Sequence, residues 1–366
     1  MKTIKMILFF LTIILNSCKN NRSNQLVINK DSIKFEKFPK QDKISFNNLI
    51  EYVEGTPQEI HVIDSILMIR NGIKGCNFLL YNYSINKKEI SKGYIAKGKG
   101  PFESIGGSKS GVLKDKIWLY DLSISKVIFL DKKKFILNQT DSLFQEFDLK
   151  KQKSTEFYFY GNVSFIDTVN YLGVDKWGSQ SKSKMEKNDL ILNQEIKGFG
   201  EFAVSSNKLN LETIRGAHKC HIYFNYKKNK AVMAYRYSDI IEIYNINSGD
   251  CVSIQGPENH DVYFTQDKGA YYFMGKTEDT KKTFVGGTFT NEFIYLIYSG
   301  HQRKNKSESD RFKWQTGEYV YVYDWKGNPV RKISLDRRVN SIGVSEDNKT
   351  LYSYDLDTGF LINSEI

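Results

Sequence analysis

Short apolar runs that end in Asn or Asp recur along the whole chain. Most of these runs are followed by a polar turn, and their last residues are Asn82, Asp131, Asn193, Asn245, Asp324 and Asn363. Asn and Asp suit such a place because their side chains accept hydrogen bonds from the backbone of the turn. The first and last markers lie 281 residues apart over five intervals, so the mean spacing is 56 residues. A four-stranded unit that recurs at this spacing predicts a six-bladed β-propeller.

The last repeat contains only three strand-like runs, at 342–344, 351–354 and 360–362. An outer strand is therefore missing from this blade. We expect a segment near the N-terminus to supply it, with 26–28 or 33–35 as candidates, because closure of the ring hides two sheet edges. A pair of β-sandwiches is the alternative interpretation, since sandwiches also consist of short strands at regular spacing.

Composition supports an all-β chain. The sequence has 23 Tyr, 24 Phe and five Pro, and it has no long stretch with apolar residues at helical spacing. Tyr, Phe, Val and Ile favour strands. We therefore expect residues 26–366 to form one propeller domain.

The first residues have the pattern of an export signal. Lys2 and Lys5 precede an apolar run over 6–15, and Ser17 and Cys18 follow it. The run is shorter than the ~20 residues that a membrane span needs. A signal peptide over 1–17 is predicted, with a polar tether over 18–25. A plain cleaved signal is the alternative.

Charge and cysteine content narrow the function classes. The formal charge is +11, but the lysines are scattered rather than clustered, so a nucleic-acid-binding surface is not expected. Beyond Cys18 there are three cysteines, Cys76, Cys220 and Cys251. They have no metal-ligand spacing, and we expect them to be buried as small apolar residues. The sequence does not decide whether two of them form a disulfide.

No catalytic constellation or metal-ligand cluster is recognisable, so no catalytic residue, metal ligand or cofactor is assigned. The chain lacks a Gly-x-Ser-x-Gly motif, and the glycine-rich segment that starts at Gly98 lacks the order of a phosphate-binding loop. Residues with polar tips do end several strand-like runs, where a propeller would place them near a channel mouth. The candidate ligand-binding residues are Arg236, Tyr237, Tyr298, Ser299 and His301.

Three segments together resemble the TolB-like six-bladed β-propeller lipoproteins of Bacteroidetes-type bacteria. They are the Leu-Asn-Ser-Cys run that ends at Cys18, the strand-like run over 293–300, and the loop Gly98-Lys99-Gly100-Pro101-Phe102-Glu103. The chain departs from the family pattern at Lys99, where Arg is frequent, and at Phe102, where Gly is common. The resemblance implies that Cys18 carries a lipid and that the loop is structural.

The resemblance therefore implies a lipid-anchored protein of the cell envelope, at the outer membrane. Residues 19–21 lack acidic side chains, which favours the periplasmic side over the cell surface. The expected role is that of a non-catalytic binding or scaffold module, with the membrane and an envelope protein or a glycan as partners and no nucleic acid. A propeller enzyme of the lactonase or lyase kind, with a cation in its central tunnel, is the rival hypothesis.

Overall fold

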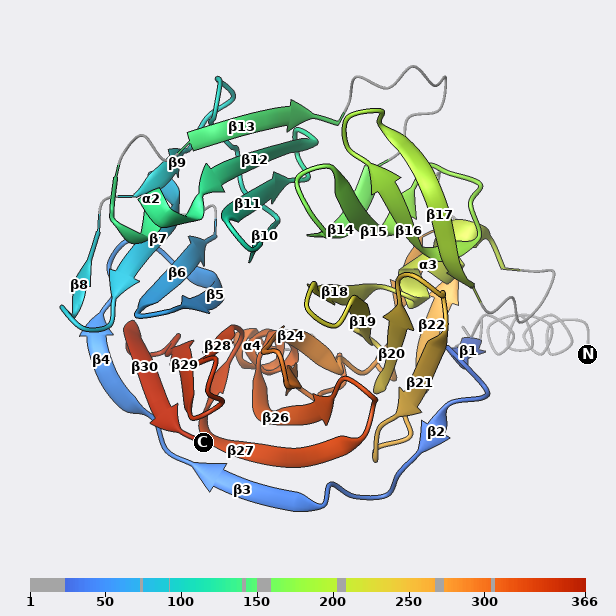
Figure 1. Cartoon of the computed structure of the whole chain (residues 1–366). Coiled ribbons are helices and arrows are strands. Elements are labelled where there is room, and N and C mark those ends of the chain that lie inside the picture. Colours follow the sequence, from blue (N-terminus) through green and yellow to red (C-terminus); the bar gives the residue numbers. More distant parts are fainter. Residues whose placement is uncertain are drawn as a thin grey trace, which may run out of the picture.

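Six sheets, antiparallel except where β2 and β3 pair in parallel with two of them, form a ring in the computed structural model (Figure 1). The structure describes residues 24–72, 75–91, 93–139, 143–149, 159–202, 209–266, 273–303 and 307–366. The innermost strand of each sheet contacts the innermost strands of the two neighbouring sheets, so the six strands surround a central channel. The prediction of an all-β, six-bladed propeller is confirmed, and the sandwich alternative is wrong.

The first three blades follow one another along the chain. Blade one consists of β5 (Pro57–Ile63), β6 (Ile66–Asn71), β7 (Phe78–Ser84) and β8 (Glu89–Ile90), with β9 (Tyr94–Ala96) also against β7. Blade two consists of β10 (Lys109–Val112), β11 (Lys116–Asp121), β12 (Lys126–Asp131) and β13 (Leu143–Asp148). Blade three consists of β14 (Phe159–Phe165), β15 (Asn170–Trp177), β16 (Ser183–Asp189) and β17 (Gln194–Glu201).

The other three blades take an additional strand from the N-terminal segment. Blade four consists of β18 (Cys220–Asn225), β19 (Lys230–Tyr235), β20 (Ile240–Asn245), β21 (Cys251–Gln255) and β2 (Ile33–Lys34). Blade five consists of β24 (Phe284–Phe289), β25 (Phe293–Tyr298), β26 (Gly317–Asp324), β27 (Pro329–Val339) and β3 (Lys40–Ile44). Blade six consists of β28 (Ile342–Val344), β29 (Thr350–Tyr354), β30 (Phe360–Glu365) and β4 (Asn47–Glu51).

Each of the six Asn or Asp markers lies in, or shortly after, the third strand of a different blade. Asn245 Oδ1 accepts hydrogen bonds from the backbone N–H groups of Asn247 and Ser248, at 3.0 and 3.2 Å. Asp131 caps the short helix α2 (Lys132–Ile136) by accepting from the Lys134 N–H. Asn245 and Asp131 therefore stabilise the turns that lead to the outer strands of blades four and two.

The N-terminal segment closes the ring, but with a different strand from those predicted. β4 (Asn47–Glu51) is the outer strand of blade six, whereas β2 pairs with β21 of blade four. β1 (Asn24–Leu26) pairs with β22 (Val262–Gln266), which together with β23 (Met274–Lys276) makes a small seventh sheet. The candidates 26–28 and 33–35 are thus wrong, because the chain first follows the outside of blades four and five (Figure 1).

Residues 24–51 form a strap along the outside of blades four, five and six. The signal peptide expected over 1–17 and Cys18 lie outside the described residues. The tether expected over 18–25 does so as well, except for Asn24 and Gln25, which belong to β1. The strap is held by buried apolar side chains, among them Leu26, Ile28 and Phe38. Phe38 packs against blade five. Its ring lies 4.7 Å from that of Tyr321 and 5.6 Å from that of Tyr323 in blade five.

Cys76 and Cys220 are buried, as predicted, but Cys251 is exposed. Cys251 begins β21, the fourth strand of blade four, away from the channel. Each of these three cysteines has a free thiol. No helix among the described residues is long and apolar enough to cross a bilayer.

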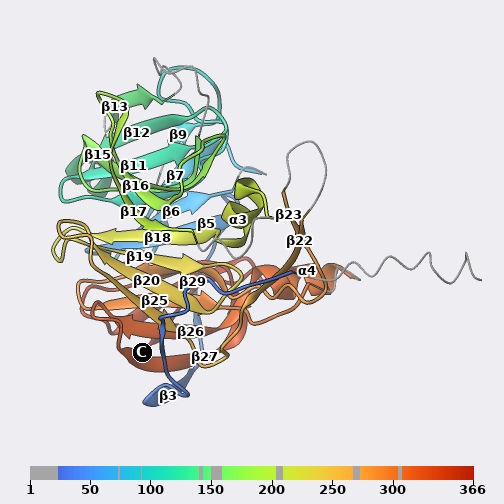
Figure 2. The same cartoon turned by 90° about the vertical axis from the view of Figure 1, so that its right-hand side faces the viewer.

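One side of the ring carries most of the added structure. Helices α3 (Leu211–Ala217) and α4 (Glu308–Gln315) and the β22–β23 hairpin all project from this side (Figure 2). Because β1 pairs with β22, the strap also begins there.

Candidate ligand-binding site in the central channel

A cavity of about 570 Å³ lies in the channel, on the side from which α3, α4 and the hairpin project. Its wall is built largely from residues at the start of the innermost strands, or just before them, among them Gln58, Ser108, Lys219 and Ser341. The end of α4 adds Trp314 and Gln315. The volume falls within the range of about 300–1,000 Å³ that is typical of small-molecule sites.

Four cationic side chains in this wall have no carboxylate within ion-pair distance among the described residues. They are Lys219, Arg236, Lys276 and Lys282. Lys276 is exposed at the rim, Lys219 and Arg236 are half-buried, and Lys282 is only 5% exposed. These four residues form the cation cluster. They come from blade four, from the β22–β23 hairpin and from the segment before β24, so the fold brings them together from separate parts of the chain.

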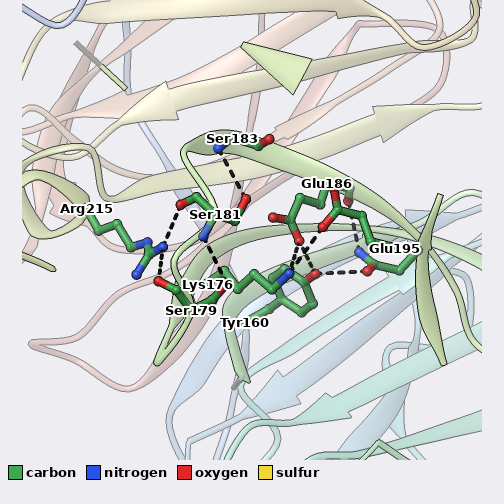
Figure 3. A network of polar contacts seen from close by, with 9 residues as sticks. Tyr160, Lys176, Ser179, Ser181, Ser183, Glu186, Glu195 and Arg215 are labelled. Atoms are coloured by element: carbon green, nitrogen blue, oxygen red, sulfur yellow. Dashed lines mark hydrogen bonds and ion pairs between the residues drawn. The ribbon is translucent and has the colours of Figure 1, made fainter. Parts of the chain in front are cut away.

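Lys282 differs from every other buried cation in the described part of the chain. Five buried Lys or Arg side chains each lie within 3 Å of a glutamate: Arg70 and Lys109 with Glu59, Lys176 with Glu186, Lys184 with Glu242, and Arg215 with Glu212. Figure 3 shows two of them, Lys176 and Arg215, among their polar partners in and beside blade three. Lys282 alone among these buried cations has no such glutamate.

Two aromatic rings take the place of a carboxylate beside Lys282. Its Nζ lies 4.7 Å from the centre of the Trp314 ring and 5.4 Å from that of Tyr237. The two rings stack on each other at 6.3 Å. Cation–π attraction contributes about 0.5–2 kcal/mol. That is less than the several kcal/mol that burial of an ion costs, so the lysine is only partly compensated.

The cations also disfavour one another's charge. Burial lowers the pKa of Lys282 well below its usual value, and Arg236, Lys276 and Lys219 add to the shift. Burial likewise lowers the pKa of Lys219 and of Lys276, with a further contribution from Arg236 in both cases. A negative charge in the cavity would relieve this repulsion.

Asp175 is the buried acid whose charge acts on both Lys219 and Arg236. It is a residue of β15 with a positive φ of 56° and is 9% exposed. Burial raises its pKa to about 7, although Lys219, Arg236 and Arg215 oppose the shift. Near neutral pH this carboxyl group is therefore incompletely ionised and does not neutralise the cation cluster.

Glu59 is the one carboxylate in the wall, and its oxygens are already engaged. Lys109 Nζ lies 2.9 Å from Oε1 and Arg70 Nε lies 2.8 Å from Oε2, which also accepts from Ser110. Although burial alone would raise it, Lys109 and Arg70 hold the pKa of Glu59 well below its usual range. The charged groups of the wall are therefore mainly ammonium and guanidinium groups. Such groups do not ligate metal ions, so the wall does not fit a metal site. Within the described residues, no three His, Cys, Asp or Glu side chains gather as a metal site.

Several neutral polar groups of the wall have unmet hydrogen-bonding capacity. The buried atoms without a partner are Asn162 Oδ1, His221 Nε2, Asn340 Oδ1, Ser341 Oγ and Trp314 Nε1, together with Arg236 Nε. Leaving such an atom unpaired costs about 1–3 kcal/mol. Their concentration in one wall indicates a place where a polar molecule belongs.

A smaller cavity of about 160 Å³ lies at the other mouth of the channel. Trp118, Phe165 and Phe289 are among its wall residues. His61, Lys109 and Tyr223 line both cavities and so mark where the two adjoin. This second mouth has less room and fewer cations.

The structure brings two of the five candidate ligand-binding residues to the cavity. Arg236 and Tyr237 line it, on the loop between β19 and β20. Tyr298 instead stacks on Tyr321 at 4.4 Å, with its ring buried in the core beside blade five. Ser299 Oγ donates to the Lys313 carbonyl, and His301 Nε2 lies 3.1 Å from Arg338 Nη1. None of these last three lines the cavity.

The loop from Gly98 to Glu103 connects blades one and two and lies away from the cavity. Glu103 Oε2 accepts from the Gly100 N–H at 2.8 Å, and a Cβ at Gly98 would collide with the same oxygen. Pro101 and Lys99 are exposed. These contacts within the loop stabilise its turn.

Sequence reasoning missed Lys219, Lys276, Lys282 and Trp314. Lys219 and Lys282 precede the innermost strands of blades four and five by one and two residues. This position marks them as channel residues only when the innermost strands are already known. His218 and His221 are three residues apart in the sequence, but they belong to different elements. The structure places His218 at the end of α3, so only His221 reaches the channel.

The fold and this cavity define the class of the protein: a six-bladed β-propeller with a small-molecule-sized site at one mouth of its channel. Residues 34–347 match the family described as TolB-like 6-blade propeller-like, and the chain belongs to that family. No curated protein matches the chain by sequence.

The solved structures that share the fold include two from Bacteroides. One is a member of the DUF4221 family from Bacteroides vulgatus, with a TM-score of 0.54 and 10% identity over 95% of this chain and 98% of that one. The other is a candidate exported protein from Bacteroides fragilis, with a TM-score of 0.52 and 12% identity over 91% of this chain and 98% of that one.

Proposed function

We propose that the protein is a non-catalytic binding module of the cell envelope that takes an anionic ligand at the mouth of its central channel. The observation that carries this proposal is Lys282, a buried lysine with no carboxylate partner in the described residues, in the wall of a 570 Å³ cavity. An unpaired buried charge destabilises a fold. Such a cost is expected where a ligand supplies the opposite charge.

The other members of the cation cluster support the same conclusion. Lys219, Arg236 and Lys276 add three cations to one wall, and clefts lined by one sign of charge concentrate ions of the opposite sign. Glu59 is a poor general base because Lys109 and Arg70 keep it ionised and engaged. These features favour binding over a metal-dependent lactonase or lyase reaction.

We further propose that a lipid on Cys18 anchors the protein to the outer membrane, facing the periplasm. Asn24 of β1 is six residues after Cys18, a distance of about 20 Å when extended. β1 lies on the same side of the ring as the cavity mouth, so the anchor would hold this mouth toward the membrane. The Cys18→Ala variant is expected to leave the membrane fraction. Retention of that variant through a lipid would contradict the anchor.

The binding proposal is tested by isothermal titration of the full chain in mild detergent with citrate, a trivalent anion without a ring. We expect one site per chain and weaker binding at high salt, because ionic screening reduces charge attraction. Lys282→Met should weaken binding about tenfold or more. Lys228→Met is the matched control, an exposed lysine beyond the other end of β18. Equal binding by both variants, or no anion binding at all, would contradict the proposal.

A further inference from the structure

We infer that the ligand is an acidic saccharide, a sugar that carries negative charge together with ring hydroxyl groups. This inference rests on the proposed anion-binding function and adds the chemical class of the ligand. It draws on the neutral part of the cavity wall, which the cation cluster does not explain.

Charge defines one half of the ligand. Lys282, Lys219 and Arg236 line one cavity with Lys276 at its rim, while Glu59 is neutralised by its own partners. A ligand that pairs with this cluster must carry at least one negative charge and has room for several. An acid group would lie at Lys282, which is the most deeply buried cation of the four.

The unpartnered neutral atoms define the other half. Asn162 Oδ1 and Asn340 Oδ1 can only accept a hydrogen bond, while Ser341 Oγ can both donate and accept. Burial holds the pKa of His221 well below its usual range, so its ring is neutral and one nitrogen also accepts. An ionised carboxylate group has no hydrogen to donate to these acceptors. Hydroxyl groups donate and accept, so a polyhydroxylated ring matches this set.

The remaining surfaces of the wall agree with a sugar ring and disfavour a lipid tail. Trp314 is half-buried beside Lys282 and offers a flat face, and its Nε1–H lacks a partner. The C–H face of a pyranose packs on such a ring while its hydroxyls point to the polar groups around it. Aliphatic side chains in the wall are few, namely Ile60, Val285 and Ile342. An acyl chain would find little apolar surface there.

The test compares three probes by isothermal titration of the full chain: trigalacturonate, which is acidic and hydroxylated, maltotriose, which is neutral, and citrate, which is acidic without a ring. We expect trigalacturonate to bind at least about tenfold more tightly than either of the other two. A nucleoside diphosphate serves as a fourth probe, because it combines charge with a different ring.

Two variants separate the halves of the site. Lys282→Met should weaken both trigalacturonate and citrate. Asn340→Ala should weaken trigalacturonate about fivefold, by loss of one hydrogen bond, and leave citrate unchanged. Lys228→Met should change neither, and melting curves of all three variants establish that they are folded.

The outcomes distinguish the inference from the proposed function. Citrate or the nucleoside diphosphate binding as tightly as trigalacturonate, with loss in Lys282→Met, would overturn the saccharide class and leave anion binding standing. Equal affinity for trigalacturonate and maltotriose would also overturn it. Absence of binding by every anion would overturn both.

Discussion

The ammonium group of Lys282 lies 4.7 Å from the centre of the Trp314 ring, and no described carboxylate stands within ion-pair distance of it. Lys184, which is buried to nearly the same degree, lies 2.7 Å from Glu242. One fold thus contains two buried lysines in opposite electrostatic situations. Substitution of each by methionine, which keeps the length of the side chain and removes the charge, separates a binding role from a structural one.

Lys282→Met is expected to stabilise the protein by about 0.5–2 kcal/mol while it weakens anion binding, because it removes an uncompensated charge. Thermal unfolding in the absence of ligand measures the first effect. Lys184→Met is the matched comparison and should lose about 3–5 kcal/mol, since the buried Glu242 would keep only neutral hydrogen-bond donors and no counter-ion. A lower melting temperature for Lys282→Met would mean that the lysine has a structural partner in the folded protein.

Anion affinity should fall as pH rises above neutrality. The pKa values of Lys282, Lys219 and Lys276 are lowered in the free protein by burial and by neighbouring cations. A bound anion favours the charged forms, so binding takes up protons wherever a free lysine is partly deprotonated. Titrations with citrate between about pH 7 and 9.5 test this, because the citrate carboxylates stay ionised throughout. Affinity that is constant over this range would contradict the account.

The lowered pKa of Lys282 also predicts how the free energy of unfolding changes with pH. A lysine whose folded-state pKa lies below its unfolded value of about 10.4 leaves the folded state with fewer bound protons between the two values. Stability of the wild-type protein therefore rises with pH across this window. The stabilising effect of Lys282→Met should be largest below the lowered pKa and shrink as pH rises.

Asp175→Asn should strengthen anion binding above about pH 7. Burial raises the pKa of Asp175 to about 7, so the carboxylate opposes a bound anion only above that value. Removal of the charge is expected to gain on the order of 1 kcal/mol at pH 8 and little at pH 5.5. Asn tolerates the positive φ of 56° at this position. Equal affinities of the two proteins at pH 8 would show that Asp175 does not act on the site.

Asp175→Asn also predicts a change in the pH dependence of stability. Because the folded-state pKa is raised above the unfolded value of about 3.9, the folded protein binds more protons between pH 4 and 7. The stability that this group contributes is present below that window and is lost as pH rises through it. Melting temperatures of the variant should lack this decline.

Phe38→Ala should detach the strap from blade five and cost about 3–5 kcal/mol. The Phe38 side chain is 3% exposed and packs on Tyr321 and Tyr323. Ile33→Ala is the control on the same strap, since Ile33 is 63% exposed and its loss should change stability by less than about 0.5 kcal/mol. Chemical denaturation measures both. Similar losses for the two variants would mean that strand pairing rather than Phe38 holds the strap.

The blades could be predicted because their signals are local. Asn245 and Asp131 hold turns only a few residues long, and such turns leave their pattern in the sequence. The strand that closes the ring could not be identified, because β4 pairs with β30 some 300 residues away and only one of its edges is paired with protein. Its sequence, Asn-Asn-Leu-Ile-Glu, is polar enough to resemble a turn.

The cavity could be predicted only in part for a related reason. Arg236 and Tyr237 were found because they follow a clear strand. Lys282 precedes β24 and Trp314 lies on α4, two segments that carry no repeat pattern, and only the folding of blade five brings the Lys282 ammonium to 4.7 Å from the Trp314 ring. Burial without a partner, the property that distinguishes Lys282, depends on contacts between distant residues.

A crystal structure of the full chain with trigalacturonate, at a concentration that saturates the titration, tests the central claim most directly. The account predicts one ligand in the 570 Å³ cavity, with an acid group within hydrogen-bond distance of Lys282 Nζ and Arg236 and a ring against Trp314. A ligand at the opposite mouth, or an unchanged cavity with Lys282 still unpaired at saturation, would contradict it.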